Sequence, residues 1–171
     1  MMQANSQEIL LPVKTGFVVL SLFAALLLNM LPWAGVWLAL RPDFAAVVLL
    51  YWCIYHPGRL GFGAAWGLGL VMDVSDAALF GQHALAYAVL VFLAIYLYRR
   101  VLRFGMKHQM MHVFLLLLLI QLIMLAVRSA AGADFPGWSY FVSSLTGAAL
   151  WPLARHALQL PQRQRHDPDS V

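Results

Sequence analysis

The chain has 171 residues, of which 63% are hydrophobic and only 11% are charged, and its formal net charge is +4. Soluble domains average roughly 45–50% apolar and 25% charged residues, and a soluble fold of this size has too little interior to bury so much apolar surface. The composition therefore excludes an ordinary soluble domain and predicts one compact helical bundle in a lipid bilayer. Basic loops against anionic lipid account for the positive charge, so no nucleic acid partner is expected.

Charged residues, prolines and glycines divide the chain into six apolar segments. In chain order these cover 15–31, 44–55, 60–72, 84–98, 110–127 and 138–153. Each run is continuously apolar, which excludes the alternating pattern of a membrane β-barrel. Helices satisfy their own backbone hydrogen bonds in hydrocarbon, so we predict an all-α integral membrane protein with about six transmembrane helices in one bundle. The tryptophans fall mostly near segment ends, as in the aromatic belts at lipid–water boundaries.

The second and third segments are short for a membrane crossing. Their 12 and 13 residues span roughly 18–20 Å, against a hydrocarbon core of about 30 Å. A re-entrant hairpin is the alternative, but it would leave Arg59 deep in the membrane at a cost of roughly 2.5–3.5 kcal/mol. Two short crossings with local thinning of the bilayer cost less. Either arrangement leaves both termini on the same side.

The distribution of basic residues orients the bundle. With the amino terminus inside, nine of the eleven Lys and Arg residues lie in inner loops and tails, and only Arg41 and Arg128 lie outside. The positive-inside bias therefore places both termini in the cytoplasm. We expect a cytoplasmic amino-terminal arm over 1–14, a multi-pass membrane domain over 15–158, and a disordered cytoplasmic tail over 159–171.

Small residues recur at a spacing of four in the third segment. Gly63 and Gly67 form one such pair, and Gly61, Ala65 and Gly69 form a longer series. This spacing puts each set on one helix face, where the missing side chains let another backbone approach. Packing within the chain is the simpler interpretation, and contact with a partner helix is the alternative.

Asp73 would be the most costly residue of the chain if it lay inside the bilayer. Its position beside Asp76, where the third segment should leave the membrane, favours a structural role, either pairing with Arg128 or capping the following turn. His108 and His112 share a helix face, but no nearby Cys, Asp or Glu supplies further ligands. A structural metal site normally needs four ligands, so no metal site is predicted.

No sequence pattern of known catalytic chemistry is present. The chain lacks a Gly-x-Ser-x-Gly elbow, a His-Glu-x-x-His helix and a phosphate-binding loop. Asp73 and Asp76 form an Asp-x-x-Asp pair, but no nucleophile and base accompany it. Cys53 stands alone in an apolar run, which favours a buried small hydrophobe. We predict no enzymatic activity, no catalytic residue and no cofactor.

A series of short motifs resembles a known family. In chain order the motifs are Leu31-Pro32-Trp33, Arg41-Pro42-Asp43, Tyr51-Trp52, Pro57-Gly58-Arg59-Leu60-Gly61, Gly67-x-Gly69, Asp73, Phe80-Gly81-Gln82-His83-Ala84-Leu85-Ala86-Tyr87 and Leu145-Thr146-Gly147-Ala148-Ala149-Leu150-Trp151-Pro152. Their order and spacing, over about residues 21–153, resemble the bacterial rod-shape-determining protein MreD family, in particular its proteobacterial branch.

The resemblance implies a non-catalytic component of the cell-elongation machinery in the bacterial inner membrane. It implies binding of the bitopic protein MreC and, directly or through MreC, of the actin-like MreB filament. The same assembly includes the glycosyltransferase RodA and its partner penicillin-binding transpeptidase. The implied fold is similar to the substrate-binding subunits of energy-coupling-factor transporters. This similarity leaves a small-molecule-binding membrane transporter subunit as the alternative function.

The two functions predict different sites. For the scaffold, six residues in and between the matched motifs are candidates for an outer partner-contact surface, namely Arg41, Asp43, Asp73, Asp76, Gln82 and His83. The basic segment 99–107 is an inner surface for MreB or for lipid. A transporter subunit should contain a cavity lined by convergent polar groups. The helices offer few candidates for such a lining beyond Asn29, Gln121, Ser143, Ser144 and Thr146.

Overall fold

The computed structural model of the protein describes residues 14–162, and over this range it contains helices and no strand. The predicted all-α class is confirmed, and one helix corresponds to each of the six apolar segments. The helices are α1 (Thr15–Met30), α2 (Val36–Leu40), α3 (Phe44–Tyr55), α4 (Phe62–Ser75), α5 (Gln82–Arg103), α6 (Met106–Ala130) and α7 (Val142–Gln159), with two short 3₁₀ helices, η1 (Trp138–Phe141) and η2 (Leu160–Gln162).

Three stretches of the described chain are long and apolar enough to cross a membrane. They are Val36–Tyr55, which joins α2 to α3, and the two long helices α5 and α6. The helices α1 and α4 are also apolar but have only 16 and 14 residues. The number of six membrane crossings therefore stays a prediction.

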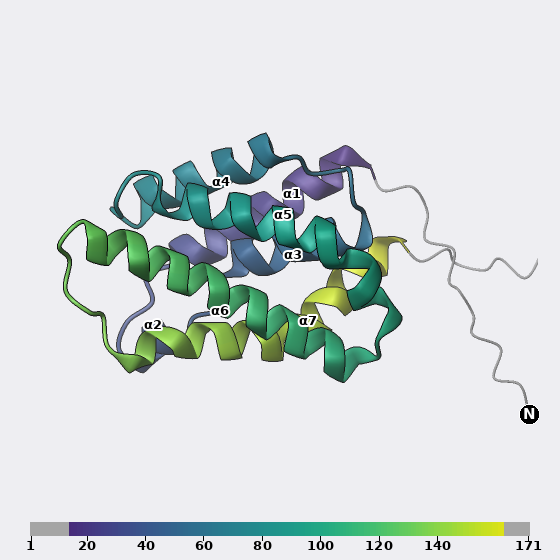
Figure 1. The fold of residues 1–171 in the computed structure, drawn as a ribbon. Coiled ribbons are helices and arrows are strands. Elements are labelled where there is room, and N and C mark those ends of the chain that lie inside the picture. The colour runs from purple at the N-terminus through teal and green to yellow at the C-terminus, as the bar shows by residue number, and fades with distance from the viewer. Residues whose placement is uncertain (1–13, 163–171) are drawn as a thin grey trace, which may run out of the picture.

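Helix α3 is the centre of the bundle. It packs against α1, α5 and α7, as Figure 1 shows, and nine of its twelve residues are buried. A helix that is apolar on all sides is typical of such a surrounded position. The uniform hydrophobicity of this short segment is thus explained by protein neighbours as well as by lipid.

Two tryptophans that the sequence assigned to an aromatic belt belong to the core instead. Trp52 on α3 and Trp151 on α7 are both fully buried. The indole N–H of Trp52 donates to Ser21 Oγ on α1 at 2.9 Å, and both rings pack near Tyr51. For these two residues the belt interpretation is wrong, because α3 and its neighbours enclose them.

The glycines in α4 and at its N-cap divide into one that packs against α5 and three that do not. A Cβ atom at Gly69 would lie 2.5 Å from the backbone nitrogen of Ala84, so the two backbones touch there. Nothing lies within 4 Å of a Cβ built at Gly61, Gly63 or Gly67. Close packing against α5 therefore explains why position 69 is a glycine. No other part of the described chain packs against the Gly63–Gly67 pair.

The folded part of the chain continues past the predicted domain boundary at 158. Gln162 is buried, and its side chain contacts Tyr51 Oη at 3.3 Å and His56 Nε2 at 3.0 Å. These hydrogen bonds hold η2 against the end of α3, so residues 159–162 are not a tail. The rest of the predicted tail and nearly all of the predicted arm over 1–14 lie outside the described residues.

Candidate functional site

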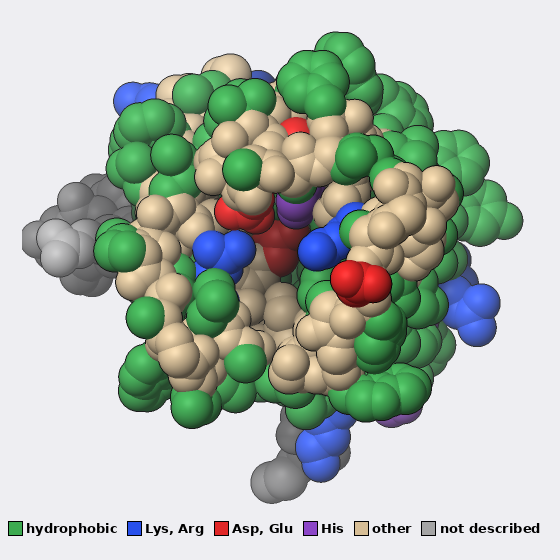
Figure 2. Space-filling view, turned by 90° about the vertical axis from the view of Figure 1, so that its left-hand side faces the viewer, with side chains coloured by type: hydrophobic (Ala, Val, Ile, Leu, Met, Phe, Trp, Pro, Cys, Tyr) green, Lys and Arg blue, Asp and Glu red, His purple; other side chains and the backbone are tan. Residues whose placement is uncertain are grey.

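One end of the bundle is hollow. The connections 31–43, 76–81 and 131–141 meet there, and we call it the outer end, after the orientation that the basic residues predict. They enclose a cavity of about 840 Å³ whose wall also includes residues of α1, α2, α4, α5, α6 and α7. Figure 2 looks onto this end, where charged side chains of both signs and a histidine surround a recess. The volume is typical of ligand sites in proteins.

Asp43 joins three helices at the wall of this cavity. It is the N-cap of α3, and its Oδ1 accepts hydrogen bonds from Ala46 N–H and Asn29 Nδ2, both at 3.0 Å. The hydroxyl of Tyr87 on α5 donates to Oδ2 at 2.8 Å. Asn29 is buried on α1 and accepts from the N–H of Phe44 at 3.0 Å. All three donors to Asp43 are neutral, so hydrogen bonds alone stabilise its charge.

Asp73 caps the helix that follows it. Its side chain is fully buried, its Oδ2 accepts from Gly81 N–H at 2.8 Å, and its Oδ1 accepts from His83 N–H at 2.7 Å. These amides lie at the start of α5, where backbone N–H groups have no partner within the helix. The ring Nδ1 of His83 also lies 2.8 Å from Oδ1. The predicted capping role is confirmed, whereas no ion pair with Arg128 occurs within residues 14–162.

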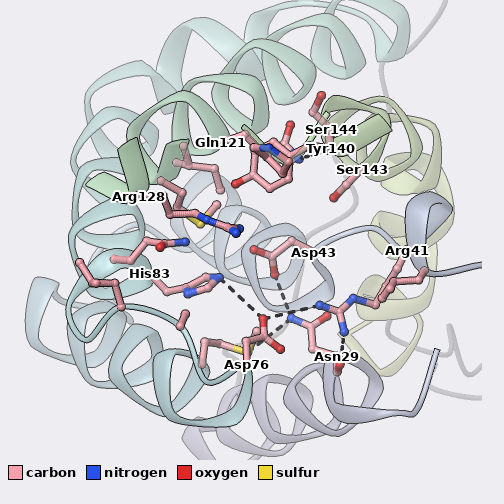
Figure 3. A pocket seen from close by; sticks show the side chains of 18 of the residues that line it. Asn29, Arg41, Asp43, Asp76, His83, Gln121, Arg128, Tyr140, Ser143 and Ser144 are labelled. Carbon is pink, nitrogen blue, oxygen red and sulfur yellow. Dashed lines mark hydrogen bonds and ion pairs between the residues drawn. The ribbon is translucent and has the colours of Figure 1, made fainter. Parts of the chain in front are cut away.

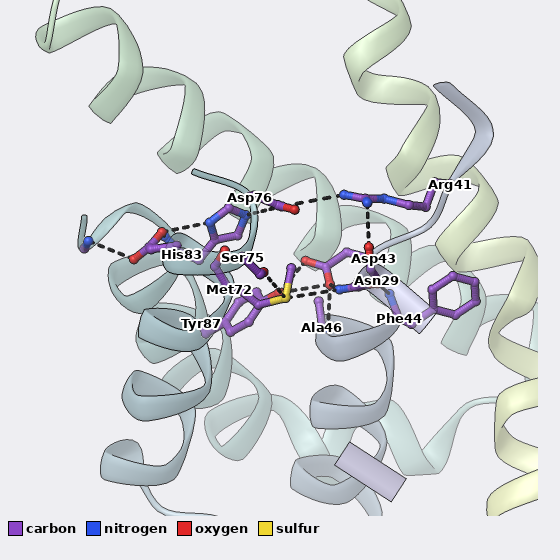
Figure 4. A network of polar contacts seen from close by, with 12 residues as sticks. Asn29, Arg41, Asp43, Phe44, Ala46, Met72, Ser75, Asp76, His83 and Tyr87 are labelled. Carbon is purple, nitrogen blue, oxygen red and sulfur yellow. Dashed lines mark hydrogen bonds and ion pairs between the residues drawn. The ribbon is translucent and has the colours of Figure 1, made fainter. Parts of the chain in front are cut away.

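Arg41 and Asp76 meet at the mouth of the cavity. Arg41 Nη2 lies 3.6 Å from Asp76 Oδ2, and Arg41 Nη1 donates to the carbonyl oxygen of Asn29 at 2.7 Å. Asp76 also lies 3.9 Å from Nε2 of His83. Figure 4 shows the resulting network, which connects the outer ends of α1, α3, α4 and α5. The Arg41 and Asp76 side chains are 22% and 29% exposed, so this ion pair itself adds at most about 1 kcal/mol of stability.

The opposite wall of the cavity comes from α6, η1 and α7. Gln121 Nε2 donates to the carbonyl oxygen of Tyr140 at 3.0 Å. Arg128 points into the cavity in Figure 3. It forms no ion pair with any residue of the described chain.

The structure brings most of the sequence-predicted residues together. Five of the six candidate contact residues line the cavity, and the sixth, Asp73, lies behind its wall. Their role in partner contact stays a prediction, and Asp43 and Asp73 direct their carboxylates to internal donors. The candidates for a polar cavity lining also converge, since Asn29, Gln121, Ser143 and Ser144 all line this cavity and Thr146 does not.

Sequence reasoning did not assign two residues of the wall, Arg128 and Tyr140. A signal for Arg128 was present, because it is one of the two basic residues on the predicted outer side. Nothing in the sequence distinguishes Tyr140 from the other aromatic residues near the segment ends.

A comparison with protein families identifies the chain. The family model described as rod shape-determining protein MreD matches residues 13–160. The chain belongs to the MreD family. The protein named rod shape-determining protein MreD from Haemophilus influenzae is 27% identical to it over 137 residues, which cover 80% of this chain and 85% of that protein.

The MreD match confirms the family resemblance and makes the protein a rod shape-determining membrane protein. The MreD family is not known as a family of enzymes. No solved structure matches the chain, so the expected similarity to the substrate-binding subunits of energy-coupling-factor transporters stays a prediction.

Proposed function

We propose that the protein is a non-catalytic scaffold of the cell-elongation machinery in the bacterial inner membrane. In this proposal six helices cross the bilayer, both termini are cytoplasmic, and the outer end binds MreC. MreC then connects the protein to MreB, RodA and the penicillin-binding transpeptidase. Membership of the MreD family supports the role in cell shape, and the three long apolar stretches support the location in a membrane.

The proposed contact surface rests on one observation, which is that charged side chains of both signs lie at the outer end of the bundle. Asp43 and Asp73 are engaged by internal donors, but Asp134 is exposed, and the paired side chains of Arg41 and Asp76 are partly exposed. Charges of both signs on one rim favour recognition of a partner with a complementary pattern, because misaligned like charges repel. The surface proposed for MreC is therefore the rim of the cavity.

Copurification from the native membrane tests this proposal. A tagged copy is solubilised in a mild detergent, and the proteins recovered with it are quantified by mass spectrometry. Charge reversal at Asp43 or Asp73 would disturb the fold, because both carboxylates are structural caps. The informative variant is the double reversal Asp76→Lys with Asp134→Lys, since Asp134 is exposed and the Asp76 side chain caps no helix of the described chain and forms only a partly exposed ion pair. Lys107→Glu, at the exposed start of α6 on the other end of the bundle, is the control.

The scaffold predicts that the rim reversal lowers recovery of MreC several-fold while the control leaves it unchanged. Equal recovery with both variants, at equal expression and equal melting temperature, would overturn the proposed contact surface. Absence of MreC from the unmodified preparation would overturn the scaffold itself.

A small-molecule-binding subunit of a membrane transporter is the second candidate. The cavity of about 840 Å³ favours it, because polar side chains from α1, α6 and α7 converge there. Such a subunit works with an ATPase and a membrane coupling subunit. Recovery of those two proteins without MreC would replace the scaffold with this function.

A further inference from the structure

The charges on the cavity wall do not all pair with one another. Two arginines and two aspartates line the cavity, and Arg41 with Asp76 forms the one ion pair between them in the described chain. Arg128 on α6 and Asp43 at the start of α3 are left without a charged partner. Figure 3 shows the Arg128 side chain directed into the cavity, with the Asp43 carboxylate at the cavity wall, where it is hydrogen-bonded to Asn29. The cavity therefore presents one unpaired positive charge and one unpaired negative charge.

Two buried acceptors in the same wall also have no donor. The Oε1 atoms of Gln82 and Gln121 have no hydrogen-bond partner in the described chain, although these residues are only 3% and 6% exposed. A buried carbonyl oxygen without a donor costs free energy that a bound N–H group would recover. Both side chains line the cavity. The wall thus contains two buried glutamine oxygens without a donor from residues 14–162, in addition to its two unpaired charges.

We propose that the cavity binds a small zwitterion, whose anionic group pairs with Arg128 and whose ammonium group is held by Asp43. The arginine guanidinium is a planar fork that fits a carboxylate or a phosphate. An ammonium group carries three donors. Asp43 Oδ2 accepts only the Tyr87 hydroxyl, so it has a free lone pair. A volume of about 840 Å³ is large enough for a dipeptide or a lipid headgroup.

Two sources supply this chemistry at a membrane surface. One is a free amino acid or short peptide, and the other is the headgroup of an ethanolamine phospholipid. An apolar groove on the surface of the bundle is consistent with the lipid source, since acyl chains lie against apolar side chains. The groove is lined by Met30, Leu70, Val71, Val74, Ser75 and Phe80.

Binding to the purified full-length protein in a non-ionic maltoside detergent tests the proposal. The first probes are L-alanyl-L-alanine, its N-acetyl form, which lacks the positive charge, and its amide, which lacks the negative charge. The second set is glycerophosphoethanolamine in solution, and phosphatidylethanolamine against phosphatidylglycerol in nanodiscs. The melting temperature and isothermal titration calorimetry report binding. The matched variants are Arg128→Gln in the cavity and Arg103→Gln, an exposed arginine at the opposite end of α5.

We expect one zwitterionic probe to bind, and removal of either of its charges to weaken binding at least about tenfold. Arg128→Gln should weaken binding to a similar extent, and Arg103→Gln should leave it unchanged. Binding of the dipeptide supports a free ligand, and binding of the ethanolamine probes alone supports a lipid headgroup.

Absence of binding by every zwitterionic probe would overturn the proposal, as would equal binding of the singly charged forms. If Arg128→Gln fails to fold, the comparison of charged and capped probes on the unmodified protein still decides the question. None of these measurements involves a protein partner, so a negative result leaves the scaffold function standing.

Discussion

A single methyl group at Gly69 should separate α4 from α5. In Gly69→Ala the new Cβ would lie 2.5 Å from the Ala84 nitrogen. Ordinary van der Waals contact begins near 3.4 Å, so the two helices must move apart by about 0.9 Å. Overpacking of a core typically costs about 1–3 kcal/mol, and the upper end applies because the obstacle is backbone. The higher helix propensity of alanine offsets about 1 kcal/mol of this cost. The free energy of unfolding should therefore fall by about 2 kcal/mol.

The matched control is Gly67→Ala, two residues away on the same helix. Nothing lies within 4 Å of its Cβ, so the propensity gain should leave stability unchanged or raise it by up to about 1 kcal/mol. For a protein of this size, a loss of about 2 kcal/mol lowers the melting temperature by about 4–8 °C. Tryptophan fluorescence of both variants in detergent during heating measures the difference. Equal melting temperatures for the two variants would refute the close approach of α4 and α5.

Three further results are expected. Asp73→Ala removes the acceptor of three donors and should destabilise the protein by about 3–5 kcal/mol, read as a lower melting temperature. Burial lowers the pKa of His56 below its ordinary value of 6.5, so the unfolded state binds more protons and stability should fall as the pH drops below about 6.5. His56→Gln should reduce that fall between pH 7.5 and 5.5. In intact cells an impermeant maleimide should label Ala133→Cys but not Lys107→Cys, and buried Cys53 should stay unlabelled.

Controls separate these outcomes from general damage. Asp134→Ala removes an exposed carboxylate without a hydrogen bond in the described chain and should change stability by less than about 0.5 kcal/mol. An equal effect of the two aspartate substitutions would contradict the capping role of Asp73. An unchanged pH dependence in His56→Gln would contradict the lowered pKa, and labelling of Lys107→Cys without permeabilisation would invert the predicted orientation.

The helices could be predicted because charge, proline and glycine interrupt the apolar runs. Asp43 and Asp73 illustrate this, since Asp43 is the N-cap of α3 and Asp73, in the last turn of α4, caps α5. The central place of α3 could not be predicted in the same way. Lipid and protein interior both select apolar side chains, so a run such as 44–55 does not reveal which of them surrounds it.

The cavity was predictable only in part. Its polar lining could be predicted, because Asn29 and Gln121 interrupt apolar helices and such side chains need hydrogen-bond partners. Their convergence depends on helix packing that brings together residues about 90 positions apart, and no local pattern encodes it. The same holds for Arg128, whose direction into the cavity depends on how α6 packs against α5 and α7.

The capping of α5 by Asp73 has a consequence for how the protein enters the membrane. A carboxylate in hydrocarbon is costly until donors reach it, and the donors of Asp73 are only 8 and 10 residues further along the chain. The Gly69–Ala84 contact lies within the same pair of helices. The α4–α5 hairpin therefore contains both the Asp73 carboxylate and the backbone N–H groups that stabilise its charge. We expect this hairpin to insert as one unit during synthesis. Asp43 differs, because Tyr87 lies 44 residues away and can reach it only after that hairpin has arrived.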